Sequence, residues 1–296
     1  MAKIEGIFIY SDYPSKSLSI PKIINCLKEY GFSAQYRGDL FEFLPESKDE
    51  AFDLARRIAG TRILDITSPL DEIHEPTYEE IDLEISRLTG KGSSLGVLYD
   101  GLWLQRMFYK NMAEKVPHEF RGGFIHLIFT SRLFGTYETG GSLTTLPLDG
   151  NVGSGGGFYR APYSYPRSQR YHARVVLTGI PSLISTSGIV EAPARPKEYY
   201  WLKASFMQAG KDLSELDLIY KGRFIEYDDS RITSVLSSYV LQAIFYELTG
   251  NPFCDNPSCC LYNSHWQEEI LKVQLGGELC EEHRDMIKSF SQFKKL

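Results

Sequence analysis

Four residues whose side chains commonly bind metal ions stand together in the C-terminal part of the chain: Cys254, Cys259, Cys280 and His283. Four residues separate the first two, and two separate the last two, so each pair can turn toward one ion. Zinc takes four nitrogen and sulfur ligands in a tetrahedron, and four protein ligands leave no position for a substrate. The spacing therefore predicts one structural zinc ion, and small sites of this kind bind zinc with about 10–16 kcal/mol.

Two neighbouring residues leave the choice of ligands open. Cys260 could replace Cys259, and His265 could replace His283, although either exchange needs a less regular turn. The alternative to a metal site is a set of buried cysteines with a surface histidine. Two paired ligand motifs are more specific than clustering alone, so the pattern favours zinc.

Composition and charge exclude several classes of function. The 296 residues carry a net charge of -6 and show no basic run interleaved with aromatics, which disfavours nucleic acid as a partner. The apolar runs are too short to cross a membrane. The chain begins Met-Ala-Lys-Ile-Glu and passes straight into a strand-like run, so we expect no signal peptide and a cytoplasmic protein. In that compartment, clustered cysteines favour metal ligation over disulfide bonds.

Strand and helix patterns alternate through the first hundred residues. Helical spacing with start and stop signals predicts helices over 19–30, 47–57 and 77–88. Apolar runs predict strands over 4–10 and 34–43.

The middle of the chain has a different pattern. Further strands are predicted over 94–99, 124–134 and 171–178, and residues 138–170 are predicted to contain a flexible glycine-rich loop. The longest helix is predicted to start near 228–230 and to stop at a glycine directly before the cysteine-rich tail.

The end of that helix and the tail resemble the archaemetzincins and a related group of archaeal proteins described as metallopeptidases. In archaemetzincins a helix carries His-Glu-x-x-His-x-x-Gly-x-x-His, and the next residue is the first cysteine of a four-cysteine structural zinc site. In this chain Cys254, Cys259 and Cys280 match three of those cysteines, and His283 stands at the fourth position. The stretch Asn-Pro-Ser-Cys at 256–259 strengthens the likeness, which residues 1–200 do not share.

The same comparison shows that the catalytic histidines and the glutamate of the archaemetzincin motif are missing from this chain. Ala243 and Ile244 stand where the first histidine and the glutamate belong. Glu247 and Phe253 replace the second and third histidines, and only Gly250 is retained. A catalytic zinc needs those ligands and an open coordination position, and the glutamate acts as general base. The resemblance therefore implies a metzincin-like scaffold with a degenerate peptidase centre, which serves as a binding or regulatory module.

The alternative function is a metal-dependent peptidase or hydrolase with non-standard ligands. Four residues are the candidates for such a site: Glu247, His126, His172 and Glu191. One carboxylate with two histidines can bind zinc or iron. Against this reading, a glutamate at a helix end is usually solvated, and a histidine in a strand usually bonds a backbone partner.

We therefore expect an α/β (α+β) fold, in which a mixed sheet is flanked by helices and a zinc ion staples the C-terminal tail. Three segments are expected: an α/β part over 1–115, a metzincin-like core over 116–250, and the zinc-binding tail over 251–296. The expected partner is a peptide or protein, with neither nucleic acid nor membrane involved. Nothing in the sequence indicates an oligomeric state.

Overall fold

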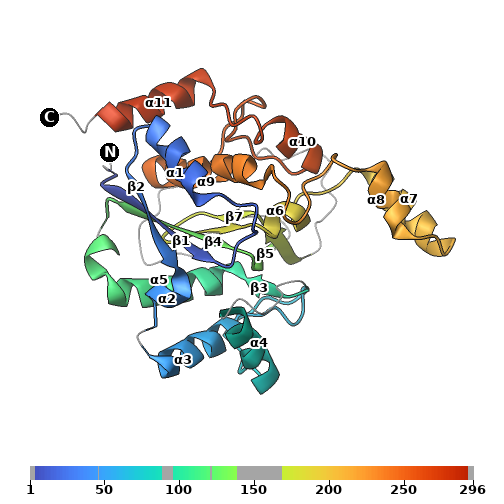
Figure 1. Cartoon of the computed structure of the whole chain (residues 1–296), viewed down its shortest axis with the longest axis horizontal. Coiled ribbons are helices and arrows are strands. Elements are labelled where there is room, and N and C mark those ends of the chain that lie inside the picture. Colours follow the sequence, from blue (N-terminus) through green and yellow to red (C-terminus); the bar gives the residue numbers. More distant parts are fainter. Residues whose placement is uncertain (1–3, 46, 89–95, 121, 139–168, 293–296) are drawn as a thin grey trace.

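The computed structural model describes residues 4–45, 47–88, 96–120, 122–138 and 169–292, and within them the expected mixed α/β architecture is confirmed. Figure 1 shows strands in the centre with helices on both sides. The strands are β1 (Gly6–Asp12), β2 (Ala34–Asp39), β3 (Leu98–Asp100), β4 (Phe124–Thr130), β5 (Leu133–Glu138), β6 (Arg170–Arg174), β7 (Val176–Leu177) and β8 (Ser182–Ser185). The helices are α1 (Ile20–Glu29), α2 (Leu40–Phe43), α3 (Lys48–Ala59), α4 (Tyr78–Leu88), α5 (Gly101–Lys115), the 3-10 helix η1 (Pro117–Phe120), α6 (Gly188–Glu191), α7 (Lys197–Gln208), α8 (Leu213–Ile219), α9 (Ile232–Thr249), α10 (Gln267–Lys272) and α11 (Glu281–Gln292).

Two sheets carry the strands. The larger sheet has the order β2-β1-β4-β8-β7, in which the first four strands are parallel and β7 is antiparallel to β8. The smaller sheet has the order β3-β5-β6, with β3 parallel and β6 antiparallel to β5. Since parallel strands point the same way, the loops after β2, β1, β4 and β8 meet at one edge of the larger sheet.

Each face of the larger sheet is covered by its own apolar cluster. Successive side chains of a strand point to opposite faces, and β1 follows this rule. Ile7 and Ile9 pack in the cluster that includes α1 and α9, whereas Tyr10 packs in the cluster that includes α2, α3 and α5.

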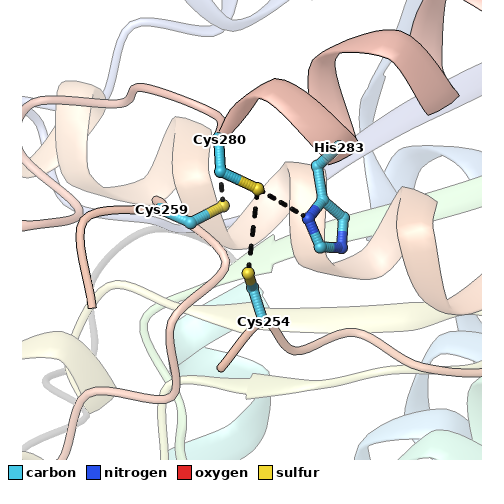
Figure 2. Close-up of side chains that lie close together, drawn as sticks. All are labelled: Cys254, Cys259, Cys280 and His283. Atoms are coloured by element: carbon cyan, nitrogen blue, oxygen red, sulfur yellow. Dashed lines mark hydrogen bonds between the residues drawn. The ribbon is translucent and has the colours of Figure 1, made fainter. Parts of the chain in front are cut away.

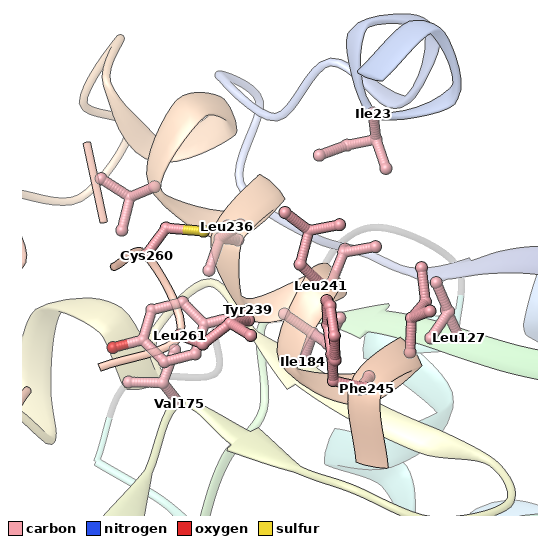
Figure 3. Packing of buried hydrophobic residues seen from close by; sticks show 14 of the residues in the cluster. Ile23, Leu127, Val175, Ile184, Leu236, Tyr239, Leu241, Phe245, Cys260 and Leu261 are labelled. Carbon is pink, nitrogen blue, oxygen red and sulfur yellow. The ribbon is translucent and has the colours of Figure 1, made fainter. Parts of the chain in front are cut away.

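Helix α9 is the central helix of the first cluster. Its residues from Ile232 to Phe245 are almost all buried, and a helix that is buried on nearly all sides belongs in an interior. In Figure 3, Phe245 of this helix lies near Ile184 of β8, and Tyr239 lies near Leu261 and Val175; all belong to the same cluster. Because α9 leads directly into the cysteine-rich tail, the buried position of α9 places the start of that tail against the core.

A buried ionic network lies at the edge where the parallel strands end. Arg132 follows β4 and is completely buried; its Nε donates to Asp12 Oδ2 at 2.7 Å, and its Nη1 pairs with the Glu84 carboxylate. The Tyr99 hydroxyl donates to Glu84 Oε1 at 2.6 Å. Burial opposes the charge of Glu84, but the guanidinium groups of Arg132 and Arg87 outweigh it and lower the pKa of Glu84 to about 2. The network thus ties the edge of the sheet to helix α4.

Most predicted helices and strands are of the right type, but several of their predicted ends differ from those in the structure. The helices predicted over 19–30, 47–57 and 77–88 are confirmed as α1, α3 and α4. The strand predicted over 34–43 is wrong beyond Asp39, because the Asp39 carboxylate accepts a hydrogen bond from the Phe41 amide at 2.8 Å and starts α2. The predicted loop at 138–170 falls almost wholly outside the described residues. The division into three segments stays a prediction, and β1 of the first pairs with β4 of the second.

The strand predicted over 124–134 is also wrong as a single element. It divides into β4 and β5, which belong to different sheets, with Arg132 between them. The ion pairs of Arg132 with Asp12 and Glu84 draw its side chain inward and so interrupt the strand.

Within the described part of the chain, none of the helices has the length and apolar character needed to cross a bilayer.

Replacing Arg132 by methionine tests the ionic network. The change leaves the carboxylate of Asp12 buried without its cation, and Glu84 keeps only its pair with Arg62 at 2.6 Å. The free energy of unfolding should therefore fall by about 3–5 kcal/mol in urea titrations.

Arg56→Met is the matched control, because the pair of Arg56 with Glu75 is exposed to water and should contribute little to stability. Equal losses in the two variants would contradict the assigned role.

Candidate metal centre

The cysteine-rich tail starts where helix α9 is stopped by a glycine. Gly250 adopts the left-handed conformation with φ 77°, and its amide bonds the Tyr246 carbonyl at 2.7 Å. The chain then turns back on itself, since the Cys254 amide donates to the Leu261 carbonyl at 3.1 Å. This local geometry brings the first pair of cysteines onto the end of α9.

Backbone amides point at two of the sulfur atoms. The Asn256 amide lies 3.4 Å from Cys254 Sγ, and the Cys280 amide lies 3.4 Å from Cys259 Sγ. Amide hydrogen bonds favour the charged form of the acceptor, and a metal binds the thiolate form of cysteine. The two turns are therefore arranged to hold thiolates.

The second pair of donors is set by the start of helix α11. Cys280 directly precedes this helix, and its carbonyl accepts from the Arg284 amide at 2.9 Å. His283 lies three residues further on, one helical turn away, so its ring reaches the same side as the Cys280 sulfur. The imidazole ring also packs edge-on against Phe245 of α9, with ring centres 5.0 Å apart.

The four donor atoms converge, as Figure 2 shows. One ligand atom from each of the four residues lies within 4.8 Å of the other three, so the group could hold a metal ion. Cys254 Sγ and Cys280 Sγ are 3.9 Å apart, and a tetrahedral zinc ion with 2.3 Å bonds needs sulfur atoms about 3.8 Å apart. Cys280 Sγ and His283 Nδ1 are closer, at 3.0 Å. A shared ion requires about 3.6 Å there, so ion binding would separate them slightly.

The thiols of this group differ in acidity. The hydrogen bond from Cys260 is the largest influence on Cys259, and it outweighs burial and lowers the pKa of the Cys259 thiol. Burial is the largest influence on Cys254 and raises the pKa of that thiol. Metal binding to this group therefore has to displace a proton from Cys254, which makes affinity rise with pH.

The two alternative ligands lie outside this group. Cys260 is fully buried in the cluster of α9, as Figure 3 shows. His265 precedes α10, and its carbonyl accepts from the Ala194 amide at 2.8 Å. Sequence reasoning missed Phe245 as the neighbour of His283. It also missed the amide of Asn256 at Cys254, although an asparagine inside a cysteine pair is a turn signal.

The four candidates for a substitute catalytic site each contact different residues. His126 on β4 is fully buried, with Nδ1 3.2 Å from the Tyr10 hydroxyl and Nε2 3.7 Å from Glu119 Oε2. His172 belongs to β6 of the other sheet and lies 3.6 Å from the Glu138 carboxylate.

The two glutamates among these candidates also have different surroundings. Glu191 on α6 accepts a hydrogen bond from the Tyr227 hydroxyl at 2.8 Å. Glu247 is half-buried near the end of α9, and burial raises its pKa. Among the described residues, the group of metal donors that comes together is the one in the tail, and it contains none of the four candidates. A catalytic role for them stays a prediction.

Comparison with known proteins adds one finding. The sequence model of a family described as "Probable metallopeptidase family (DUF6775)" matches residues 3–142 and 162–290. Searches of curated proteins and of solved structures gave no match.

The buried His126 predicts a pH effect on stability. Desolvation is the main cause that lowers its pKa to about 4, and Arg37 adds to it against the opposing effect of Glu119. The unfolded chain, with an ordinary histidine pKa near 6.5, then binds the proton more readily than the folded one. Stability from the neutral ring is fully present above pH 6.5 and falls by about 3 kcal/mol as the pH drops toward 4.

The matched comparison is His126→Phe, because Phe120 stacks on the ring at 4.6 Å and the site accepts an aromatic group. Urea unfolding at pH 7.5 and pH 4.5 should show a smaller acid loss in the variant than in the wild type. Carboxylates such as Glu84 titrate in both proteins and cancel in the difference. An identical loss in both proteins would show that His126 carries no such effect.

Proposed function

The chain belongs to this probable metallopeptidase family, and we propose that it uses the scaffold as a zinc-stapled binding or regulatory module without peptidase activity. The observation that carries the proposal is the burial of two residues of helix α9. Ala243 and Ile244, which stand where the archaemetzincin likeness would have a histidine and the glutamate, are both completely buried among apolar side chains. A catalytic zinc needs ligands there and access for water.

The ion in the proposed structural site is zinc. Three thiolates and one imidazole are a ligand set that zinc prefers, and a closed set of four suits a structural role. The order of helix α9, the turn at Gly250 and the cysteine pairs along the chain supports the archaemetzincin likeness. The ion would bind the start of helix α11 to the turns that follow α9.

The partner in this proposal is a peptide or protein. The net charge of -6 supports the absence of nucleic acid from the interaction. As part of the same proposal, the protein acts in the cytoplasm without membrane attachment.

Replacing Cys280 by serine tests the zinc site. The variant should lose its metal and show a strongly lowered melting temperature, because the binding free energy of the ion is part of the folding free energy. Elemental analysis and thermal unfolding provide the two readouts. Cys26→Ser is the matched control, since Cys26 is a free cysteine outside the group and should leave one zinc per chain. Unchanged melting of Cys280→Ser with full zinc content would exclude the site.

Replacing Glu247 by alanine distinguishes the proposed binding or regulatory function from the alternative, a metal-dependent hydrolase. The half-buried Glu247 is the carboxylate nearest to the former catalytic motif in sequence, so a substitute active site would use it first. We expect one zinc per chain and no peptide hydrolysis both before and after the substitution. A second, weakly held metal that disappears with Glu247, or hydrolysis that depends on it, would favour the hydrolase.

A further inference from the structure

The carboxyl ends of β1 and β4 lie at the point where the larger sheet changes direction. The chain passes from β1 to β2 on one side, whereas β4 and then β8 follow on the other side, in the sheet order β2-β1-β4-β8-β7. Figure 1 shows β1 and β4 in the centre of the sheet. In open α/β sheets, ligands bind in the crevice outside the carboxyl ends of the strands at such a point. The topology therefore marks this edge as a place for a ligand.

Polar residues occupy both strand ends. Asp12 is the last residue of β1, and Ser131 and Arg132 follow β4 directly. The Ser131 amide donates to the Asp12 carbonyl at 3.2 Å, so the two chain segments stay side by side beyond the sheet. Ser131 is half-buried and Tyr13, in the next loop, is 37% exposed. This edge of the sheet thus reaches the surface of the molecule.

Three guanidinium groups are buried here, and they do not share the carboxylates evenly. Glu84 pairs with Arg62 at 2.6 Å and also with Arg132. Glu80, which is partly exposed, lies 3.6 Å from Arg62. Arg87 is 3% exposed, and among the described residues no carboxylate forms an ion pair with it. Arg87 is therefore a buried cation without an anion of its own, although buried charges are normally paired.

Arg87 contacts two hydroxyl groups instead. Its Nη1 donates to the Tyr99 hydroxyl at 2.6 Å, and its Nη2 reaches Ser131 Oγ only at 3.5 Å. Burial and the neighbouring charge of Arg132 lower the pKa of Arg87, so its positive charge is poorly compensated. An anion beside Ser131 would compensate that charge.

Two more atoms at this edge are buried without a hydrogen-bond partner among the described residues, namely Arg132 Nη2 and Asp12 Oδ1. They flank one ion pair, in which Arg132 Nε donates to Asp12 Oδ2 at 2.7 Å. Arg132 is completely buried and Asp12 is 1% exposed. The guanidinium N–H needs an acceptor, and the carboxylate oxygen needs a donor. A ligand that satisfies both atoms and also Arg87 has to be an anion that carries a hydroxyl group.

Inorganic phosphate has this combination of groups. Its charged oxygens accept hydrogen bonds from guanidinium groups, whose fork of donors suits phosphate. Near pH 7 it also keeps at least one P–OH group, which can donate to a carboxylate. Sulfate and carboxylates carry no such proton, and a water molecule lacks the charge that Arg87 needs.

We propose that inorganic phosphate binds between the ends of β1 and β4. Arg87 and Arg132 donate to its charged oxygens, Asp12 Oδ1 accepts from its P–OH group, and Ser131 lies where the site meets the surface. The bound phosphate connects α4, which carries Arg87, to the sheet. The site uses none of the donors of the metal centre and does not depend on a bound zinc ion.

Calorimetric titration of the full chain in a phosphate-free buffer tests this site. Inorganic phosphate should bind once per chain, and sulfate should bind at least about tenfold more weakly because it has no proton for Asp12. Arg87→Met should weaken phosphate binding at least about tenfold. Its melting temperature without phosphate should not fall, because the replaced cation has no carboxylate partner. The matched control is Arg223→Met, whose pair with Glu268 is exposed, and it should bind phosphate as the wild type does.

The substitution Asp12→Asn tests the selectivity of the site. An amide can donate to an oxyanion that has no proton, so this variant should bind phosphate and sulfate with similar affinity. A wild type that binds no phosphate at about 10 mM would overturn the proposal. So would equal affinities of the wild type for phosphate and sulfate, unchanged phosphate binding by Arg87→Met, or a preference for phosphate that survives in Asp12→Asn.

Discussion

Burial of helix α9 governs how the elements around it pack. Most of its side chains need cover from water, and the larger sheet with helix α1 provides only part of that cover. The remaining cover comes from the C-terminal tail, in which Cys254, Cys259 and Leu261 join the same cluster. A cation held by the four donors would add a direct connection between α11 and the turns that follow α9.

The same helix carries the proposal that this chain acts without peptidase activity. In a working metallopeptidase of the kind that the tail resembles, one face of this helix has to present ligands to water. Here Ala243 and Ile244 are completely buried in the core. In the proposed function, packing residues therefore occupy the positions where a peptidase of that kind has its ligands.

Charged groups in the interior hold together elements that apolar packing does not join. Arg132 connects the edge of the larger sheet to Glu84 of α4, and the Arg37 pair with Glu119 closes the region around His126. The hairpin of α7 and α8 follows another principle, because its few buried residues contact each other and leave large side chains in water.

Features that depend on local spacing could be predicted from the order of the residues. The helices at α1, α3 and α4, the stop at Gly250 and the four donors of the tail follow from caps, glycines and short intervals between residues. The tertiary structure decided what depends on distant segments. The inward turn of Arg132 that divides β4 from β5 requires Asp12 and Glu84, which no local pattern reveals. The same holds for the meeting of Cys280 with Cys254 and for the separate apolar cluster of α7 and α8, because long-range packing places side chains that are far apart in sequence.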